Sequence, residues 1–300
     1  MTKFPIIDAH QHFWDLSMNK HPWLCGDHMS PFRYGDYSSI KRTYLPEDYL
    51  SDSKAFNIVK TVHMEAEWDP EDPLGETDWI MRQHEITGYP NAIIGQAWFM
   101  KDNIETVLAG HATCPLMRSV RQKPAAAASP EEFQPGAPGS LADPAFRAGY
   151  AKMGEYGLHY DLQTPWWHLS EAASLAKDFP ETTIILNHTG LPSDRSATGI
   201  ARWKAGMEIF AAQPNTAVKI SGICVPGEKW TTDLNGGVVL ETIRIFGVER
   251  CMFASNFPVD GVVAGYDDIF NGFADNVSEL SEADQLKLFH DNAMKYYRPV

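Results

Sequence analysis

Cysteine is scarce in this chain, which has only four cysteines among its 300 residues. They lie far apart, at positions 25, 114, 224 and 251, and no Cys-X-X-Cys pair occurs. This spacing argues against a disulfide framework and against a structural zinc knot. Reduced thiols are typical of the cytoplasm, so we predict a cytoplasmic protein.

Basic residues are also few, because 25 Lys and Arg face 39 Asp and Glu, which gives a formal net charge of −14. Such a surface repels phosphate backbones, so we expect no nucleic-acid partner. An acidic protein can still hold a locally basic pocket. The charge therefore leaves a small-molecule substrate as the expected partner.

Long hydrophobic runs are missing as well. No segment approaches the roughly 18 apolar residues that a membrane span needs, so we expect no membrane partner. The first residues, MTKFP, lack the apolar stretch of a secretory signal. The sequence does not fix the oligomeric state, and a homo-oligomer remains open.

The chain contains instead a regular alternation of short apolar runs and helix-like segments. The β-like runs cover residues 4–9, 58–65, 92–99, 116–122, 158–163, 183–188, 217–223 and 251–256. Short apolar runs with β-branched residues are typical of parallel strands that are buried on both faces. The helix-like segments cover residues 77–87, 144–156, 169–178, 200–212, 238–246 and 281–296.

This alternation predicts an α/β fold, a single (β/α)8 TIM barrel over residues 1–300. Length alone, at roughly 150 residues per domain, suggests two domains, but barrels of this length commonly form one. A doubly wound open sheet is the alternative. It is disfavoured because no glycine-rich phosphate loop follows the first run.

Two long irregular stretches interrupt the alternation. Residues 16–46 are rich in aromatic, proline and charged residues, and residues 123–143 are rich in Pro, Ala, Gly and Ser. Both begin after the C-terminal end of a predicted strand, so both should overhang the mouth of a barrel. Loops of this length are commonly active-site lids or disordered segments. We expect aromatic residues of 16–46 to close the site.

His10 and His12 lie at the end of the first predicted strand, with Gln11 between them. The two-residue period of a strand places both imidazoles on one side, which at the mouth of a barrel can be the interior. Two neutral imidazoles can hold a divalent metal or polarise a carbonyl. The alternative is an incidental His-X-His in a loop.

Further polar residues lie on other predicted strands. Glu65 ends the second strand, with His63 at the same two-residue offset, and Gln96 lies in the third. Arg118 and Arg121 have an odd spacing, so at most one of them points inward. Arg121, nearer the C-terminal end, is the better candidate to bind a substrate carboxylate, although a structural salt bridge is an equal alternative.

The later strands carry candidates too. Asp161 shares a face of the fifth strand with His159 and Gln163, and Lys219 shares a face of the seventh with Ser221. His188 ends the sixth strand in LNHTG, which makes it a candidate for substrate or metal contact. Asn256 ends the eighth strand, and Asp260 follows in the next loop.

These positions resemble the amidohydrolase-related branch of the amidohydrolase superfamily, described as metal-dependent hydrolases of the TIM-barrel fold. The matching segments are IIDAHQHFWD at 6–15, MRSVRQ at 117–122, IILNHTG at 184–190, VKISGI at 218–223, CMFASNFPVD at 251–260 and the ending LFHDNAMKYYRP. The resemblance spans the whole chain in order. Members of this branch open lactones of sugar acids or aromatic acids, L-fuconolactonase and 2-pyrone-4,6-dicarboxylate lactonase among them.

The resemblance implies roles for individual residues. His10 and His12 match the family's pair after the first strand, His188 matches the histidine that meets the lactone carbonyl, and Arg121 matches an arginine that meets substrate oxygens. Asn256 departs from the pattern, because the family usually has an aspartate there as general base. An amide can orient water but cannot take its proton at neutral pH, so Asp260 or a histidine is the expected base.

Three hypotheses follow. The first is hydrolysis of a lactone by water addition at the carbonyl, with Glu65, Gln96, Arg121 and Asp161 binding substrate. One divalent, zinc-like ion could be held by His10, His12 and His188, since the fourth strand offers no bridging carboxylate; a metal-independent reaction is equally open. The second is a zinc-dependent decarboxylase of the same superfamily. The third is a non-catalytic ligand-binding barrel that has lost its base.

Overall fold

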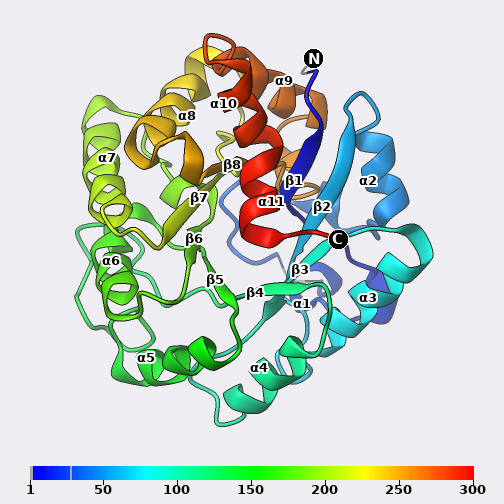
Figure 1. Ribbon diagram of the computed structural model, residues 1–300, viewed down its shortest axis with the longest axis vertical. Helices are drawn as coiled ribbons and strands as arrows, with labels where there is room; N and C mark the ends of the chain where they lie inside the picture. Colours follow the sequence, from blue (N-terminus) through cyan, green and yellow to red (C-terminus); the bar gives the residue numbers. More distant parts are fainter. Residues whose placement is uncertain (1–2, 28) are drawn as a thin grey trace.

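Eight parallel strands form the centre of the molecule (Figure 1). The computed structural model describes residues 3–27 and 29–300. The strands follow one another around the sheet in chain order. They are β1 (Ile6–Gln11), β2 (Ile58–Met64), β3 (Ala92–Gln96), β4 (Met117–Arg121), β5 (His159–Leu162), β6 (Ile184–Leu186), β7 (Thr216–Ile220) and β8 (Cys251–Phe253).

The sheet closes on itself where the first strand meets the segment that follows the last. The amide of Asn256 donates to the carbonyl of His10 at 2.8 Å, and the amide of His12 donates to the carbonyl of Phe257 at 2.8 Å. The molecule is therefore a (β/α)8 TIM barrel, as the alternation of the sequence predicts. The doubly wound alternative is wrong.

Helices surround the barrel (Figure 1). In the described residues they are α1 (Pro22–Cys25), α2 (Pro46–Asp52), α3 (Gly75–Thr87), α4 (Ile104–Ala112), α5 (Pro144–Tyr150), α6 (Leu169–Asp178), α7 (Ala197–Ala211), α8 (Thr232–Phe246), α9 (Tyr266–Asn276), α10 (Glu282–Leu286) and α11 (Asn292–Tyr297). None of them is long and apolar enough to cross a membrane.

Several helix boundaries differ from those expected. The helices α1, α2, α4 and α9 were not predicted from the sequence, and both α7 and α8 begin earlier than expected. Their N-caps explain the early starts, because the side chain of Ser196 accepts from the amide of Gly199 and that of Thr231 accepts from Leu234. The expected last helix is interrupted by a π-helical turn between α10 and α11.

The last helix closes the N-terminal end of the barrel. Ala293 and Tyr297 of α11 pack in one apolar cluster with interior residues such as Ile7 and Ile185. The carbonyl of Tyr296 bonds to the ring of His159, the first residue of β5, at 3.0 Å. Access to the interior is therefore left at the opposite end, where the strands finish and their C-terminal loops begin.

A β-bulge in β1 sets the direction of the first two candidate residues. The pairing of β1 with β2 shifts between Asp8 and Gln11. Asp8 accepts from the hydroxyl of Tyr49 in α2 and so lies on the helix side, whereas Ala9 packs inside the barrel. The extra residue brings His10 to the inside as well, and His12 follows it.

Candidate active site

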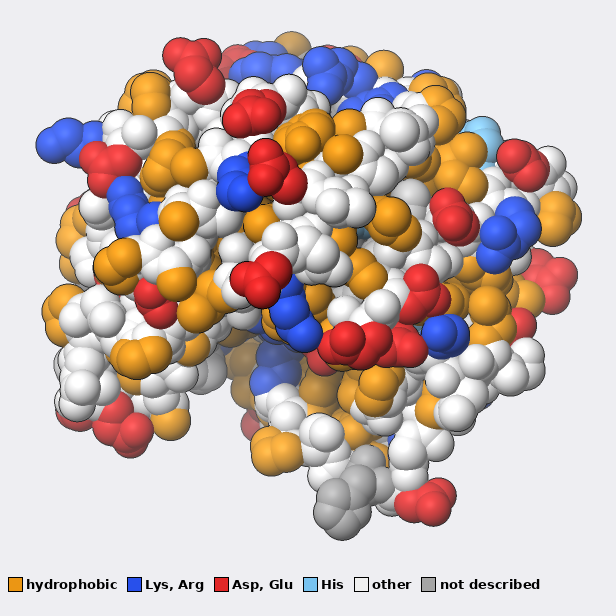
Figure 2. Space-filling view, turned by 90° about the horizontal axis from the view of Figure 1, so that it is seen from below, with side chains coloured by type: hydrophobic (Ala, Val, Ile, Leu, Met, Phe, Trp, Pro, Cys, Tyr) orange, Lys and Arg blue, Asp and Glu red, His pale blue; other side chains and the backbone are white. Residues whose placement is uncertain are grey.

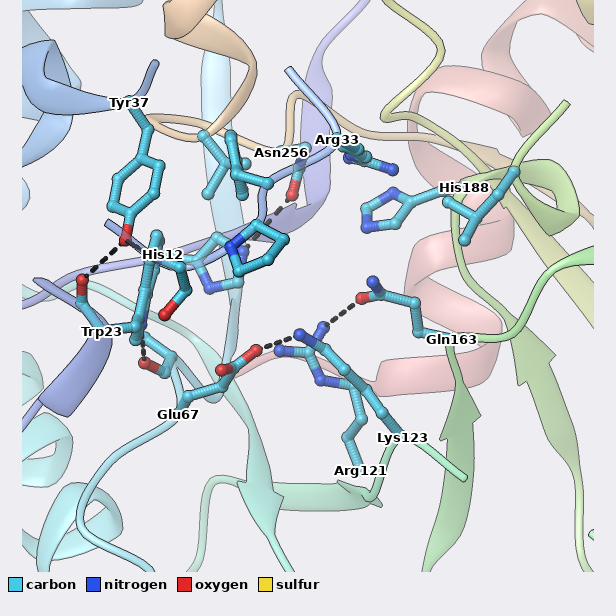
Figure 3. A pocket seen from close by; sticks show the side chains of 16 residues that line it. His12, Trp23, Arg33, Tyr37, Glu67, Arg121, Lys123, Gln163, His188 and Asn256 are labelled. Atoms are coloured by element: carbon cyan, nitrogen blue, oxygen red, sulfur yellow. Dashed lines mark hydrogen bonds and ion pairs between the residues drawn. The ribbon is translucent and has the colours of Figure 1, made fainter. Parts of the chain in front are cut away.

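A cavity of about 430 Å³ opens at the C-terminal ends of the strands (Figure 3). The loop over residues 16–46 covers one side of it, as expected, with the aromatic rings of Trp23, Phe32 and Tyr37. A side view of the molecule shows a hollow at its lower edge with Lys or Arg side chains inside it (Figure 2). The lining residues are His12, Trp23, Ser30, Pro31, Phe32, Arg33, Tyr37, Ala66, Glu67, Arg121, Lys123, Gln163, His188, Leu191, Asn256 and Val259.

His12 lines this cavity, and His10 lies next to it in the barrel interior. Their Nε2 atoms lie 3.3 Å apart, and both rings are buried. The Nδ1 of His12 donates to the carbonyl of Met64 at 2.9 Å, so the Nε2 of neutral His12 carries a lone pair. Burial holds the pKa of His12 well below 6.5, and Arg121 lowers it further. Burial and Lys219 do the same to the pKa of His10.

Asn256 turns its amide oxygen toward this pair. Its Nδ2 donates to Asp260 Oδ1 at 2.6 Å, which fixes the orientation of the amide, and its Oδ1 lies 3.3 Å from His12 Nε2. An amide oxygen and an imidazole lone pair therefore face one another, and two acceptors cannot satisfy each other. A cation bound by both atoms, or a water molecule that donates a proton to them, would satisfy these two acceptors.

This arrangement tests the predicted metal site. Within residues 3–27 and 29–300, no group of three or more His, Cys, Asp or Glu side chains could hold a metal ion. His10, His12 and His188 do not form such a group among these residues, so a metal ion held by all three stays a prediction. The donors that do converge are the Nε2 atoms of His10 and His12 and the Oδ1 of Asn256. Two neutral imidazoles and an amide oxygen fit one divalent ion.

His188 faces the cavity from the end of β6. Its ring centroid lies 4.8 Å from that of His10, and its Nδ1 bonds to Ser221 Oγ at 2.9 Å. No other residue in the described part of the chain bonds to its Nε2. Burial lowers the pKa of His188 well below 6.5, and the charges of Arg33 and Arg121 lower it further. His188 is therefore neutral at physiological pH.

Arg121 is placed for both of the roles that the sequence left open, which are ligand binding and a structural salt bridge. It lines the cavity and also bonds to Glu65 through Nε and to Gln163 Oε1 through Nη1, at 3.2 Å. Its Nη2 donates to the carbonyl of Glu65 at 2.7 Å. A guanidinium has five N–H groups, so donors remain for a ligand. Arg118 lies outside, bonded to the carbonyls of Pro115 and Met117.

Three charged lining residues, Arg33, Glu67 and Lys123, were not predicted as site residues from the sequence (Figure 3). Glu67 and Lys123 form an ion pair across the mouth. With Arg121, the cavity presents three cationic side chains and one carboxylate, in a protein whose net charge is −14. The cavity is thus locally basic and suits an anionic ligand.

Asp260 does not line the cavity. Its carboxylate accepts from Asn256 Nδ2 and from the hydroxyl of Tyr34 at 2.9 Å, with Arg33 Nη2 at 3.6 Å. Burial raises its pKa. Asp260 therefore lies behind the amide and orients it, and the expectation that it takes a proton directly from a water in the cavity does not fit its position.

Replacing Asn256 with aspartate should destabilise the protein in a pH-dependent way. The new carboxylate would lie within hydrogen-bond distance of Asp260, so the two must share a proton and one folded-state pKa is raised. The folded state then binds more protons than the unfolded state above about pH 4, and stability falls as pH rises, by about 1–3 kcal/mol at pH 8. Denaturant unfolding at pH 5 and pH 8 measures this, with Asn256→Ser as control; an equal loss at both pH values would contradict it.

Some predicted site residues lie away from the cavity. The amide of Gln96 donates to the carbonyl of Trp68 at 3.0 Å. Asp161 pairs with Lys219 at 2.8 Å in the barrel interior, below the cavity. His63 packs on the helix side, where its ring lies 3.3 Å from Glu76. Neither Gln96 nor Asp161 lines the cavity, so the expectation that they contact a substrate there is corrected.

Backbone strain gathers around the cavity. Glu67, His188 and Asn256 all have positive φ, at 56°, 56° and 54°. Side chains other than glycine rarely adopt this conformation, and it persists where the surrounding structure imposes it, often at functional sites. All three residues line the cavity.

Known proteins resemble this chain over its full length. The family model described as Amidohydrolase matches residues 7–298. A protein of Sinorhizobium fredii, named uncharacterized protein y4mH, is 40% identical, with 99% of this chain and 100% of that protein covered. An L-fucono-1,5-lactonase of Burkholderia multivorans is 25% identical, with 97% and 95% covered.

Solved structures share the fold. A crystal structure of an amidohydrolase from Burkholderia multivorans with bound HEPES superposes with a TM-score of 0.79 at 22% identity and covers 99% of this chain and 100% of that one. The same amidohydrolase with bound zinc gives a TM-score of 0.78 at 22% identity, with 99% and 100% covered.

Proposed function

Because this chain belongs to the amidohydrolase family, we propose that it hydrolyses the lactone of a small carboxylic acid. One observation supports this most directly: His12, His188 and Asn256 line the same cavity as the cationic side chains of Arg33, Arg121 and Lys123. The first group can act on a carbonyl and a water, and the second can bind the oxygens of an acid.

His188 is the group best placed to move a proton. If its Nδ1 donates to Ser221 Oγ, the lone pair on Nε2 faces the cavity and can accept a proton from water. The same nitrogen can return that proton to the ring oxygen as the ester bond breaks. The lowered pKa of His188 keeps the ring neutral before the reaction, so that its Nε2 lone pair is not already protonated.

His12 and Asn256 would act on the lactone carbonyl rather than on the proton. A divalent ion, when bound by His10, His12 and Asn256, would supply Lewis-acid polarisation of the carbonyl. Asp260 fixes the amide of Asn256 so that its oxygen points toward the reacting groups. Arg121 has free donors with which to hold a carboxylate or hydroxyl of the substrate.

A panel of lactones tests the proposal. Sugar-acid and aromatic-acid lactones are incubated with the purified protein, and the released acid is followed with a pH indicator. The assay is repeated after treatment with a chelator, and elemental analysis measures the metal content of the protein. We expect acid release from at least one class. A folded protein that opens none of them contradicts the proposal. Release of CO₂ from hydroxybenzoic acids would indicate the decarboxylase instead, and neither reaction would indicate a binding protein.

A further inference from the structure

A second cavity adjoins the first. It has a volume of about 460 Å³ and is walled largely by apolar side chains, including Pro165, Trp167, Ile223 and Val225. Its charged lining residues in the described part of the chain are two arginines, Arg33 and Arg195, and no carboxylate lines it. The site proposed above uses neither Arg195 nor these apolar walls.

Arg33 and Leu191 line both cavities and so form the wall between them. Arg33 lies beside the ring of His188 (Figure 3). Gly222 lies at the same point, and a Cβ there would collide with the His188 ring and with the Arg33 guanidinium. A molecule in the second cavity would therefore reach to within one side chain of the proposed reaction site.

The two arginines carry unsatisfied donors. Arg33 Nη1 and both Nε and Nη1 of Arg195 are buried and have no hydrogen-bond partner among residues 3–27 and 29–300. Arg195 bonds through Nη2 to the carbonyl of Ile223 at 2.8 Å and to Asn235 Oδ1 at 3.3 Å, both neutral groups. Among the ion pairs of residues 3–27 and 29–300, none involves Arg195. Buried polar groups are nearly always bonded, so these donors are available to an anionic group in the cavity.

We propose that the second cavity is a substrate subsite that binds a carboxylate carried on an apolar or aromatic arm. The carboxylate accepts from Arg195, and the arm packs on Trp167, Ile223 and Val225. This rests on the proposed function in one respect: the preferred substrate is then a lactone with such an arm, whose ring lies beside His188 while the acid lies beyond Arg33.

Binding tests the subsite without any reaction. The probes are 3-phenylpropionate and its uncharged counterpart 3-phenylpropan-1-ol, measured by titration calorimetry with the wild-type protein, Arg195→Gln, Ser193→Trp and the control Arg244→Gln. Ser193 is an exposed residue of the cavity rim, and Arg244 is an exposed arginine of α8 remote from both cavities. We expect the acid to bind at least about tenfold more tightly than the alcohol, since a charge-assisted pair contributes on the order of a factor of ten.

The variants locate that binding. Arg195→Gln should remove the preference for the acid, Ser193→Trp should weaken both probes by filling the cavity, and Arg244→Gln should change neither. Equal affinity of the wild-type protein for acid and alcohol overturns the subsite. So does an acid preference that Arg195→Gln and Ser193→Trp leave intact.

Kinetics test the link to the reaction. For any lactone that the wild-type protein opens, a form with an acid-ended apolar arm should have a KM at least about tenfold lower than the bare lactone, and Arg195→Gln should raise only the armed KM, with kcat retained. If no lactone is opened, the proposed function fails while the calorimetry still decides the subsite. If lactones are opened but the KM is the same with and without the acid-ended arm, the second cavity does not bind this substrate.

Discussion

Replacing His188 with glutamine should lower kcat/KM for lactone hydrolysis by at least about 100-fold, while the fold is retained. General acid–base groups typically contribute factors of 10²–10⁴, and glutamine keeps a polar side chain of similar reach but cannot take a proton. The change is measured as initial rates of acid release. The melting temperature, measured in parallel, shows whether the fold is intact.

Two controls separate a proton-transfer role from a structural one. Ser221→Ala removes the partner of His188 Nδ1 but keeps the imidazole, so we expect a smaller loss, on the order of tenfold. His290→Gln replaces a histidine far from the cavity, on the π-helical turn, and should leave the rate unchanged. A His188→Gln protein that retains more than half of the wild-type rate would exclude His188 as the base.

The sequence predicted that His12, His188 and Asn256 lie close together because each follows an apolar strand within three residues. Parallel strands bring such positions to one end of a barrel. Period-two reasoning also explains why Arg121 faces inward while Arg118 does not. These inferences depend on local pattern alone.

The residues that sequence reasoning missed depend on long-range contacts instead. Arg33 comes from the long loop over 16–46, where no periodicity fixes the direction of a side chain. Glu67 follows β2 in a left-handed conformation that turns it toward Lys123, a contact between residues 56 apart in the chain. The pairing of Asp161 with Lys219 in the barrel interior could not be predicted from a sequence pattern either, because the two residues lie two strands apart.

That internal pair carries the second large prediction. Asp161 and Lys219 are both fully buried, and their charged atoms lie 2.8 Å apart. The carboxylate also accepts from the hydroxyl of Tyr297 and from Asn187 Nδ2, at 2.9 Å and 2.8 Å. Through these bonds Asp161 connects the interior of the barrel to the helix that closes its end. Burial lowers the pKa of Lys219 to about 8, although the carboxylate opposes this.

Asp161→Asn should therefore destabilise the protein by about 3–5 kcal/mol near pH 7, the cost of leaving one member of a buried pair uncompensated. Without the carboxylate, the pKa of Lys219 should fall below about 8. Near pH 7 the lysine of the unfolded chain, with a pKa near 10.4, is protonated, whereas Lys219 of the folded variant loses its proton. This difference in bound protons favours the unfolded state of the variant. Wild type and variant both hold a neutral Lys219 well above pH 8, so the difference between them should shrink there. Denaturant unfolding at pH 7 and pH 9 measures both effects.

The double variant Asp161→Asn/Lys219→Met distinguishes lost charge compensation from lost packing. Asparagine can still accept from Tyr297, and methionine fills similar volume without a charge, so most of the stability at pH 7 should return. If the double variant is as unstable as Asp161→Asn, the loss comes from the hydrogen bonds to Tyr297 and Asn187 rather than from an unpaired ammonium. An Asp161→Asn protein as stable as wild type would mean that the ion pair contributes nothing to the barrel interior.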